Sequence, residues 1–80
     1  MNKKIHSSIG AANRAIKKAG GNRALAYLLL PNAKMQIDIF RMEKRIAQWS
    51  RLGVAAKWAI RVEEVTGVSR HSLRPDIYPK

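Results

Sequence analysis

Apolar residues recur at helical spacing along most of the chain. In the first part of the chain the intervals are three and four residues, and the positions are Ile9, Ala12, Ile16 and Ala19. Ser8 stands before this run, where a helix N-cap is favourable. Gly20 and Gly21 follow it and favour a helix end. The pattern predicts a helix over residues 8–19, preceded by a flexible N-terminus over residues 1–7.

A second, shorter helix is predicted over residues 23–30. Asn22 is a candidate N-cap, and Pro31 ends the helix because its ring removes the amide donor and clashes with the preceding turn. Three leucines of this helix are predicted to face the core, next to the small Ala26: Leu25, Leu28 and Leu29.

The longest apolar stripe lies in the middle of the chain, at intervals of four, three, four and three: Met35, Ile39, Met42, Ile46 and Trp49. It predicts a helix of about 20 residues, capped by Asn32 and ending at Gly53. Its first part also alternates apolar and polar residues, as a strand does. We therefore predict a helix over residues 41–52 and leave loop, strand and helix open for residues 32–40.

A further helix is predicted over residues 55–66, with Trp58, Val62 and Val65 on its buried face and Gly67 at its end. The C-terminal tail, residues 69–80, contains a short turn at residues 69–73 and packs on the core. Asp76 is expected to pair with a basic neighbour. Together these elements predict an all-α fold of five helices in a single domain, residues 1–80.

Length and composition set limits on the function. The chain has 80 residues, of which 46% are hydrophobic, and no cysteine, so it supports one small core without disulfides or thiolate metal sites. The longest apolar run, residues 24–31, is far shorter than the roughly 20 residues of a membrane span. The first residues lack the apolar region of a signal peptide. We expect a cytoplasmic protein.

The charge is strongly unbalanced. Sixteen Lys and Arg face five Asp and Glu, for a formal net charge of +11. Residues 1–37 contain seven basic residues and no acid. Such a charge predicts a polyanionic partner, of which nucleic acid is the commonest. RNA is the weaker choice, because both tryptophans fall on apolar faces and leave no aromatic platform for base stacking.

The chain lacks the side-chain patterns of an enzyme. His6 and His71 stand at opposite ends, with no acid spaced for a triad or a metal cage. Gly20 and Gly21 lack the Gly-Lys pattern of a phosphate-binding loop. We predict no catalytic activity, no cofactor and no metal.

Three segments together resemble a known family. They are AGGNRALA (residues 19–26), RIAQW (residues 45–49) and residues 54–78, within which EEVTGVSRHSLRPD (residues 63–76) is the most specific. This pattern is similar to the YdaS-like, Cro-type helix-turn-helix proteins of bacterial prophages. The resemblance implies a λ-repressor-like helical domain that binds operator DNA and regulates transcription, commonly as a repressor of prophage genes and associated with the nucleoid. Some members are described as antitoxins.

The resemblance also implies DNA-contacting residues. Asn22 opens the second helix and, with Arg23, corresponds to positions that contact phosphates. The third helix enters the major groove, where Lys and Arg reach guanine, Gln pairs with adenine and Glu accepts from cytosine. The matching positions on this helix are Glu43, Lys44, Arg45 and Gln48. Arg51 and Lys57 flank the loop after the helix and are candidates for phosphate contacts.

One departure from the family pattern concerns residues 31–40. This segment replaces the short turn between the second and third helices and adds about ten residues, as a bulged loop or as an N-terminal extension of the third helix. Its apolar residues favour a protein partner, either a second copy of the chain, assembled on DNA, or a cognate toxin. The alternative function is therefore a toxin–antitoxin interaction module whose DNA contact is secondary.

Overall fold

The computed structural model describes residues 3–79. In chain order its elements are α1 (Lys3–Ala19), α2 (Asn22–Leu29), α3 (Gln36–Leu52), the 3-10 helix η1 (Ala56–Trp58), α4 (Ala59–Thr66) and α5 (Arg70–Leu73). The described residues form no strand. The predicted all-α architecture with five α-helices is confirmed.

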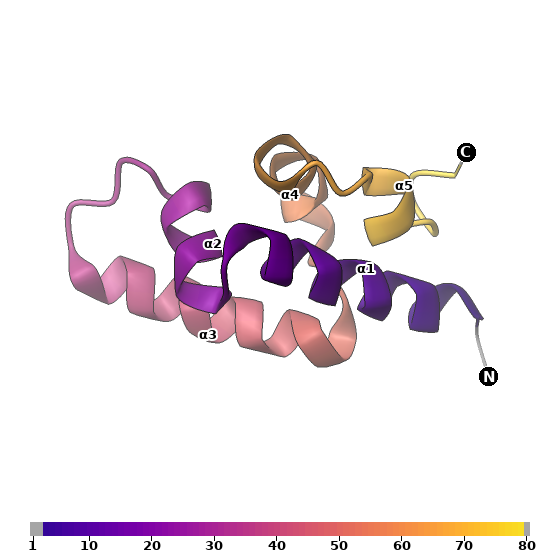
Figure 1. Cartoon of the computed structure of the whole chain (residues 1–80), viewed down its shortest axis with the longest axis horizontal. Coiled ribbons are helices and arrows are strands. Elements are labelled where there is room, and N and C mark those ends of the chain that lie inside the picture. Colours follow the sequence, from indigo (N-terminus) through magenta and orange to yellow (C-terminus); the bar gives the residue numbers. More distant parts are fainter. Residues whose placement is uncertain (1–2, 80) are drawn as a thin grey trace.

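The molecule is elongated, with extents of 39 × 21 × 20 Å. α1 and α3 pack side by side along its length and run in opposite directions, while α2 crosses them at one end (Figure 1). α4 and α5 lie over α1 on the other side from α3 (Figure 1). The connection between α2 and α3, residues 30–35, therefore lies at the end of the molecule opposite the chain termini.

One core joins all these elements. The largest fully buried side chains come from five different segments: Leu25, Ile46, Val54, Val62 and Leu73. Burial of each such side chain contributes about 1.5–3 kcal/mol. The α1 side of the core consists of small residues, Ala11, Ala12 and Ala15, so the other helices approach its backbone closely.

The start of α1 differs from the prediction. The helix begins at Lys3, so residues 3–7 are helical, and residues 1–2 lie outside the described residues. Ser8 is buried inside the helix, and a Cβ added at Gly53 would lie 3.4 Å from its Oγ. The assignment of Ser8 as an N-cap is wrong, because the helix begins at Lys3 and Ser8 lies within it, at a close approach to Gly53.

α2 begins one residue earlier than predicted. Gly21, at φ 117°, is its N-cap, and no side chain caps it. The assignment of Asn22 as the cap is therefore wrong. Leu25 and Leu29 are buried, but Leu28 is 40% exposed. α1, α3 and α4 all contact this helix, and they cover the side that carries Leu25 and Leu29 and leave Leu28 in solvent.

The sequence left the conformation of residues 32–40 open, and the structure divides them between a loop and the start of α3. Residues 31–35 form a loop, and α3 then starts at Gln36 with Met35 as its N-cap. Asn32 is not a cap, and residues 36–40 are helical rather than extended. Ile39, Met42, Ile46 and Trp49 are buried as predicted, whereas Met35 is 63% exposed because the helix begins after it.

The predicted helix over residues 55–66 is divided into η1 and α4. Val62 is buried, and Trp58 and Val65 are half-buried against the core. Gly67 ends α4 at φ 79°, a left-handed conformation that glycine adopts without strain. The turn at residues 69–73 is confirmed as α5, which Ser69 caps by accepting from the backbone N–H of His71.

Candidate nucleic-acid interface

α3 has two distinct long faces. One is the buried stripe of residues 39, 42, 46 and 49. The opposite face follows the same spacing and consists of exposed side chains: Ile37, Phe40, Lys44, Gln48 and Arg51. Residues three and four apart on a helix are neighbours on its surface. The structure therefore brings three of the sequence-predicted DNA contacts, Lys44, Gln48 and Arg51, onto one continuous surface.

The basic residues of α3 are free within the described part of the chain. Arg41, Arg45 and Arg51 are exposed and form no ion pair or hydrogen bond with any residue between 3 and 79. Lys44 makes a cation–π contact, with its Nζ 4.7 Å from the centroid of the Phe40 ring. Four positive charges on one helix are thus available to an anion outside the chain.

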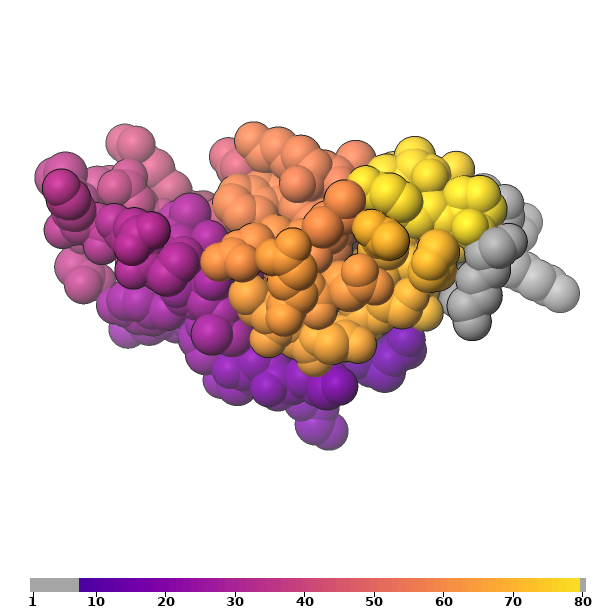
Figure 2. Space-filling view, turned by 90° about the horizontal axis from the view of Figure 1, so that it is seen from above, coloured from indigo at the N-terminus to yellow at the C-terminus, as the bar shows by residue number. Residues whose placement is uncertain are grey.

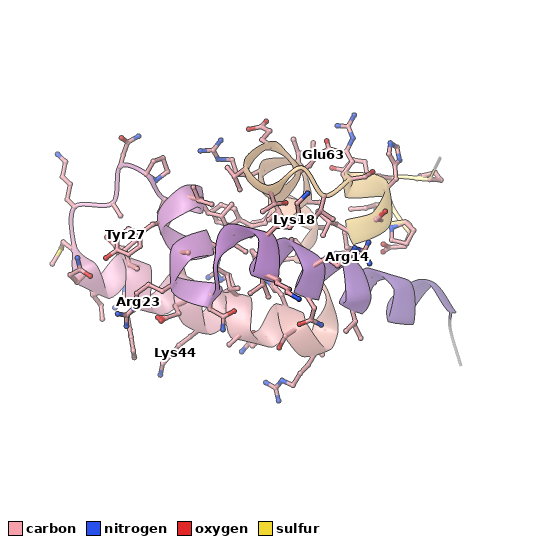
Figure 3. The ribbon with its side chains drawn as sticks, in the orientation of Figure 1. Arg14, Lys18, Arg23, Tyr27, Lys44 and Glu63 are labelled. Atoms are coloured by element: carbon pink, nitrogen blue, oxygen red, sulfur yellow. The ribbon has the colours of Figure 1, made fainter. Side chains whose placement is uncertain are left out.

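Glu43 does not belong to this free surface. Its Oε1 accepts from Nε of Arg23 at 3.2 Å, and its side chain is 23% exposed against 73% for Arg23. The pair ties the start of α2 to the middle of α3. Arg23 still points to the same side of the molecule as Lys44 (Figure 3). Of the two predicted contacts, the carboxylate of Glu43 is occupied, and the guanidinium of Arg23 is largely exposed but paired with it.

The remaining predicted residues lie beside the outward face. Asn22 is half-buried at the first position of α2. Lys57, on η1, has its Nζ 6.0 Å from the centroid of the Trp58 ring. A surface hollow of about 490 Å³ brings Lys57 together with Arg45 and Gln48 at the end of α3. Lys57 of η1 is therefore adjacent to two of the predicted contact residues of α3.

A larger cleft, of about 520 Å³, lies on the flank of α3 near the 30–35 loop. Its apolar lining includes Leu30, Met42 and Trp58, and Asp38, Arg41 and Arg45 supply its charges. The Nε1 atom of Trp58 is buried without a hydrogen-bond partner in the described residues.

The first turns of α3 project from the body of the molecule. Residues 31–38 are all exposed, and in the view from above the segment around residues 30–40 lies at one end, outside the cover of α4 and α5 (Figure 2). Sequence reasoning missed three side chains of this projection: Ile37, Phe40 and Arg41. The phase of the buried stripe identifies them as outward-facing once the helix is known to start at Gln36.

Two specific features are absent from the described residues. Among residues 8–79, whose side chains the structure describes, no group of three or more His, Cys, Asp and Glu could hold a metal ion. Within residues 3–79, no helix combines the length and apolar character needed to cross a membrane.

No protein-family model, curated protein or solved structure matches the chain.

Proposed function

We propose that this protein is a sequence-specific DNA-binding regulator of transcription, which binds operator DNA through α3. The observation that carries the proposal is the outward face of this helix. Lys44 and Arg51 are exposed on that face and Arg41 and Arg45 on its flank, and none of the four has an acidic partner in the described chain. Free cations on one helix match the phosphate groups that flank a major groove, and a groove admits one α-helix.

The arrangement of α2 and α3 supports the same proposal. In a helix-turn-helix domain the first helix crosses the DNA backbone and the second lies in the major groove, contacting bases with its N-terminal residues. Here α2 packs across α3, and the N-terminal turns of α3 project beyond the body of the molecule. Arg23 at the start of α2 is then a phosphate contact, and Lys44 lies on the groove-facing side.

The proposed class is the λ-repressor-like, YdaS-like type of prophage regulator, acting in the cytoplasm on the nucleoid. The long connection between α2 and α3 is its unusual feature. It consists of the 30–35 loop followed by an N-terminal extension of α3, so the tight turn of the standard motif is replaced by a longer one that still allows α2 and α3 to pack together.

Selection of duplexes from a randomised pool tests the proposal, because the selection itself identifies the operator sequence. The enriched duplex and a scrambled duplex of equal length are then compared over several salt concentrations. A preference of at least about a thousandfold is expected of a specific binder. Equal binding to both duplexes with a steep salt dependence would mean that the protein binds DNA only through its phosphates, without sequence preference. This result would contradict the proposal.

The second candidate is a protein-interaction module of the toxin–antitoxin type with secondary DNA binding. The cleft lined by Leu30, Met42 and Trp58 favours it, together with the 63% exposure of the neighbouring Met35. Equal binding to enriched and scrambled duplexes would favour this candidate. The partner would be a protein segment with apolar side chains that fill the cleft and acidic ones that reach Arg41 and Arg45.

A further inference from the structure

Two large apolar side chains occupy the face of α3 that the proposed function directs toward DNA. Ile37 is 43% exposed and Phe40 is 50% exposed. They precede Lys44 at intervals of three and four residues, so the three side chains form one continuous strip. Exposed apolar residues are ordinary when scattered. A pair aligned with a binding face indicates a ligand that is itself partly apolar.

The surroundings of this pair are cationic. Nζ of Lys44 lies 4.7 Å from the Phe40 ring centroid, and Arg41 is exposed beside it. The nearest acid on the helix, Asp38, lies on the flank and lines the cleft together with Arg41, so Lys44 is the charged residue in contact with the strip itself. A ligand that covers Ile37 and Phe40 must therefore present apolar groups and negative charge within a few ångströms of each other.

A second copy of the chain does not meet this requirement. A symmetric contact would apply the same strip to itself, so Arg41 and Lys44 of both copies would face each other in a chain of net charge +11. Duplex DNA does meet it. Its phosphates line the major groove, and every thymine places an apolar C5-methyl group on the groove floor, where apolar side chains contact it.

We infer that Ile37 and Phe40 read thymine methyl groups in the major groove and so determine the sequence preference of this protein. The inference rests on the proposed function and adds its specificity determinants. The two residues lie in the first turns of α3, the part of a recognition helix that reaches base edges. Lys44 and Arg41 hold the neighbouring guanines or phosphates, and the bound sequence contains thymines beside the positions that they contact.

The first experiment uses the wild-type protein and the duplex enriched from a randomised pool. Every thymine of that duplex is replaced by uracil, which removes the C5-methyl group and leaves base pairing unchanged. We expect Kd to rise about fourfold for each methyl group that the protein buries. An unchanged Kd on the uracil duplex overturns the inference, and it does so without affecting the preference for the enriched over the scrambled sequence.

The second experiment assigns the effect to the two side chains. Ile37→Ala and Phe40→Ala are each expected to reduce the thymine–uracil ratio of Kd values, and the double variant is expected to bind the two duplexes with nearly equal Kd. Ile60→Ala is the matched control, because Ile60 is 41% exposed on α4, and it is expected to retain the full thymine–uracil ratio. All substituted positions are exposed, and circular dichroism checks that each variant keeps its helix content.

The outcomes separate the two proposals. Absence of any enriched sequence overturns both the proposed function and this inference. An enriched sequence whose thymine–uracil ratio is the same for Ile37→Ala, Phe40→Ala and Ile60→Ala overturns the inference alone. A change from dimer to monomer on Ile37→Ala, measured by sedimentation without DNA and with the thymine–uracil ratio unchanged, also overturns it, because a second copy would then cover the strip.

Discussion

Two regions of this molecule use their charges in different ways. Residues 3–58, which contain α1, α2, α3 and η1, carry twelve Lys and Arg against two acids. Residues 59–79, which contain α4, α5 and the tail, carry three arginines and three acids. Every acid in this second region is paired with one of its arginines: Arg61–Glu64 at 3.0 Å, Arg70–Glu63 at 3.8 Å and Arg74–Asp76 at 2.6 Å.

In residues 59–79 the ion pairs hold the chain together. Glu63 accepts from the backbone N–H of Arg70 at 2.9 Å, which joins α4 to the start of α5. Arg74 donates to Asp76 and to the carbonyl oxygen of Val54, which fixes the tail against the end of α3. In residues 3–58 most cations have no such role and repel one another. The difference supports the proposal that the first region binds an external polyanion, whereas the charges of the second region join its own elements.

The largest expected effect tests whether the two regions form one cooperative unit. Leu73 of α5 is fully buried, and α5 packs against α1. Leu73→Ala is expected to lower the free energy of unfolding by about 2–5 kcal/mol, in a single transition in urea. Ile77→Ala, in the same region but 45% exposed, is the control and is expected to cost under about 0.5 kcal/mol. A separate transition of α4 and α5 at lower urea concentration would contradict this prediction, because the two regions would then not unfold as one cooperative unit.

Removal of the free cations of α3 is expected to have the next largest effect. The triple variant Arg41→Gln, Lys44→Gln and Arg45→Gln should reduce the slope of log K against log salt by about 2.7, or about 0.9 for each lost phosphate contact. Arg61→Gln, which removes a paired arginine in the other region, is the control and should leave the slope unchanged. Equal reductions per residue would show that location on α3 does not matter.

A smaller effect is expected from the one acid that neutralises a cation at the interface. Glu43→Gln releases Arg23 and is expected to steepen the salt slope by about 0.9 and tighten DNA binding. It should cost under about 1 kcal/mol of stability, because the pair is partly exposed. Glu64→Gln makes the same charge change beside Arg61. A similar gain in DNA affinity for this variant would mean that net charge alone sets the binding.

The smallest effect concerns pH. The hydrogen bond from Arg74 lowers the pKa of Asp76 from 3.8 to about 2. A carboxyl group with a lowered pKa in the folded state stabilises the fold above its ordinary pKa, and this contribution is lost as the pH falls from about 4 toward 2. The urea midpoint of the wild type should fall over this interval, and that of Asp76→Asn should fall less. Identical pH profiles would exclude Asp76 as a contributor.

Much of the fold is predictable because the apolar residues that face the core recur at helical spacing in the sequence. The stripe of residues 39, 42, 46 and 49 identifies the buried face of α3 correctly, since four buried positions fix the phase of a helix, but the predicted range, residues 41–52, omits the helical residues 36–40. Leu28 could not be assigned in the same way. The burial of each leucine of α2 depends on how α1, α3 and α4 pack against this helix. The residues that determine this packing lie outside α2, so the local sequence does not identify the buried leucines.

The limits for the candidate interface have similar causes. Lys44 and Gln48, predicted from the resemblance, and Arg51, predicted from its place beside the following loop, lie on the exposed side of α3. The pairing of Arg23 with Glu43 joins residues 20 positions apart, and no local pattern contains it. Ile37 and Phe40 were missed because residues 32–40 fit a strand and a helix equally well. Met35 fits the spacing of the apolar stripe but lies just before the helix, so the sequence predicted a buried stripe one position longer than the observed one.

The measurement that tests the central claim most directly is a nuclear magnetic resonance titration of the ¹⁵N-labelled protein with the enriched duplex. At 9.0 kDa the free protein is small enough for each backbone amide to be followed. The account predicts the largest shift changes at residues 22–23 and 37–51, with small changes over residues 59–79. Largest changes over residues 59–79, or changes spread evenly along the chain, would contradict it.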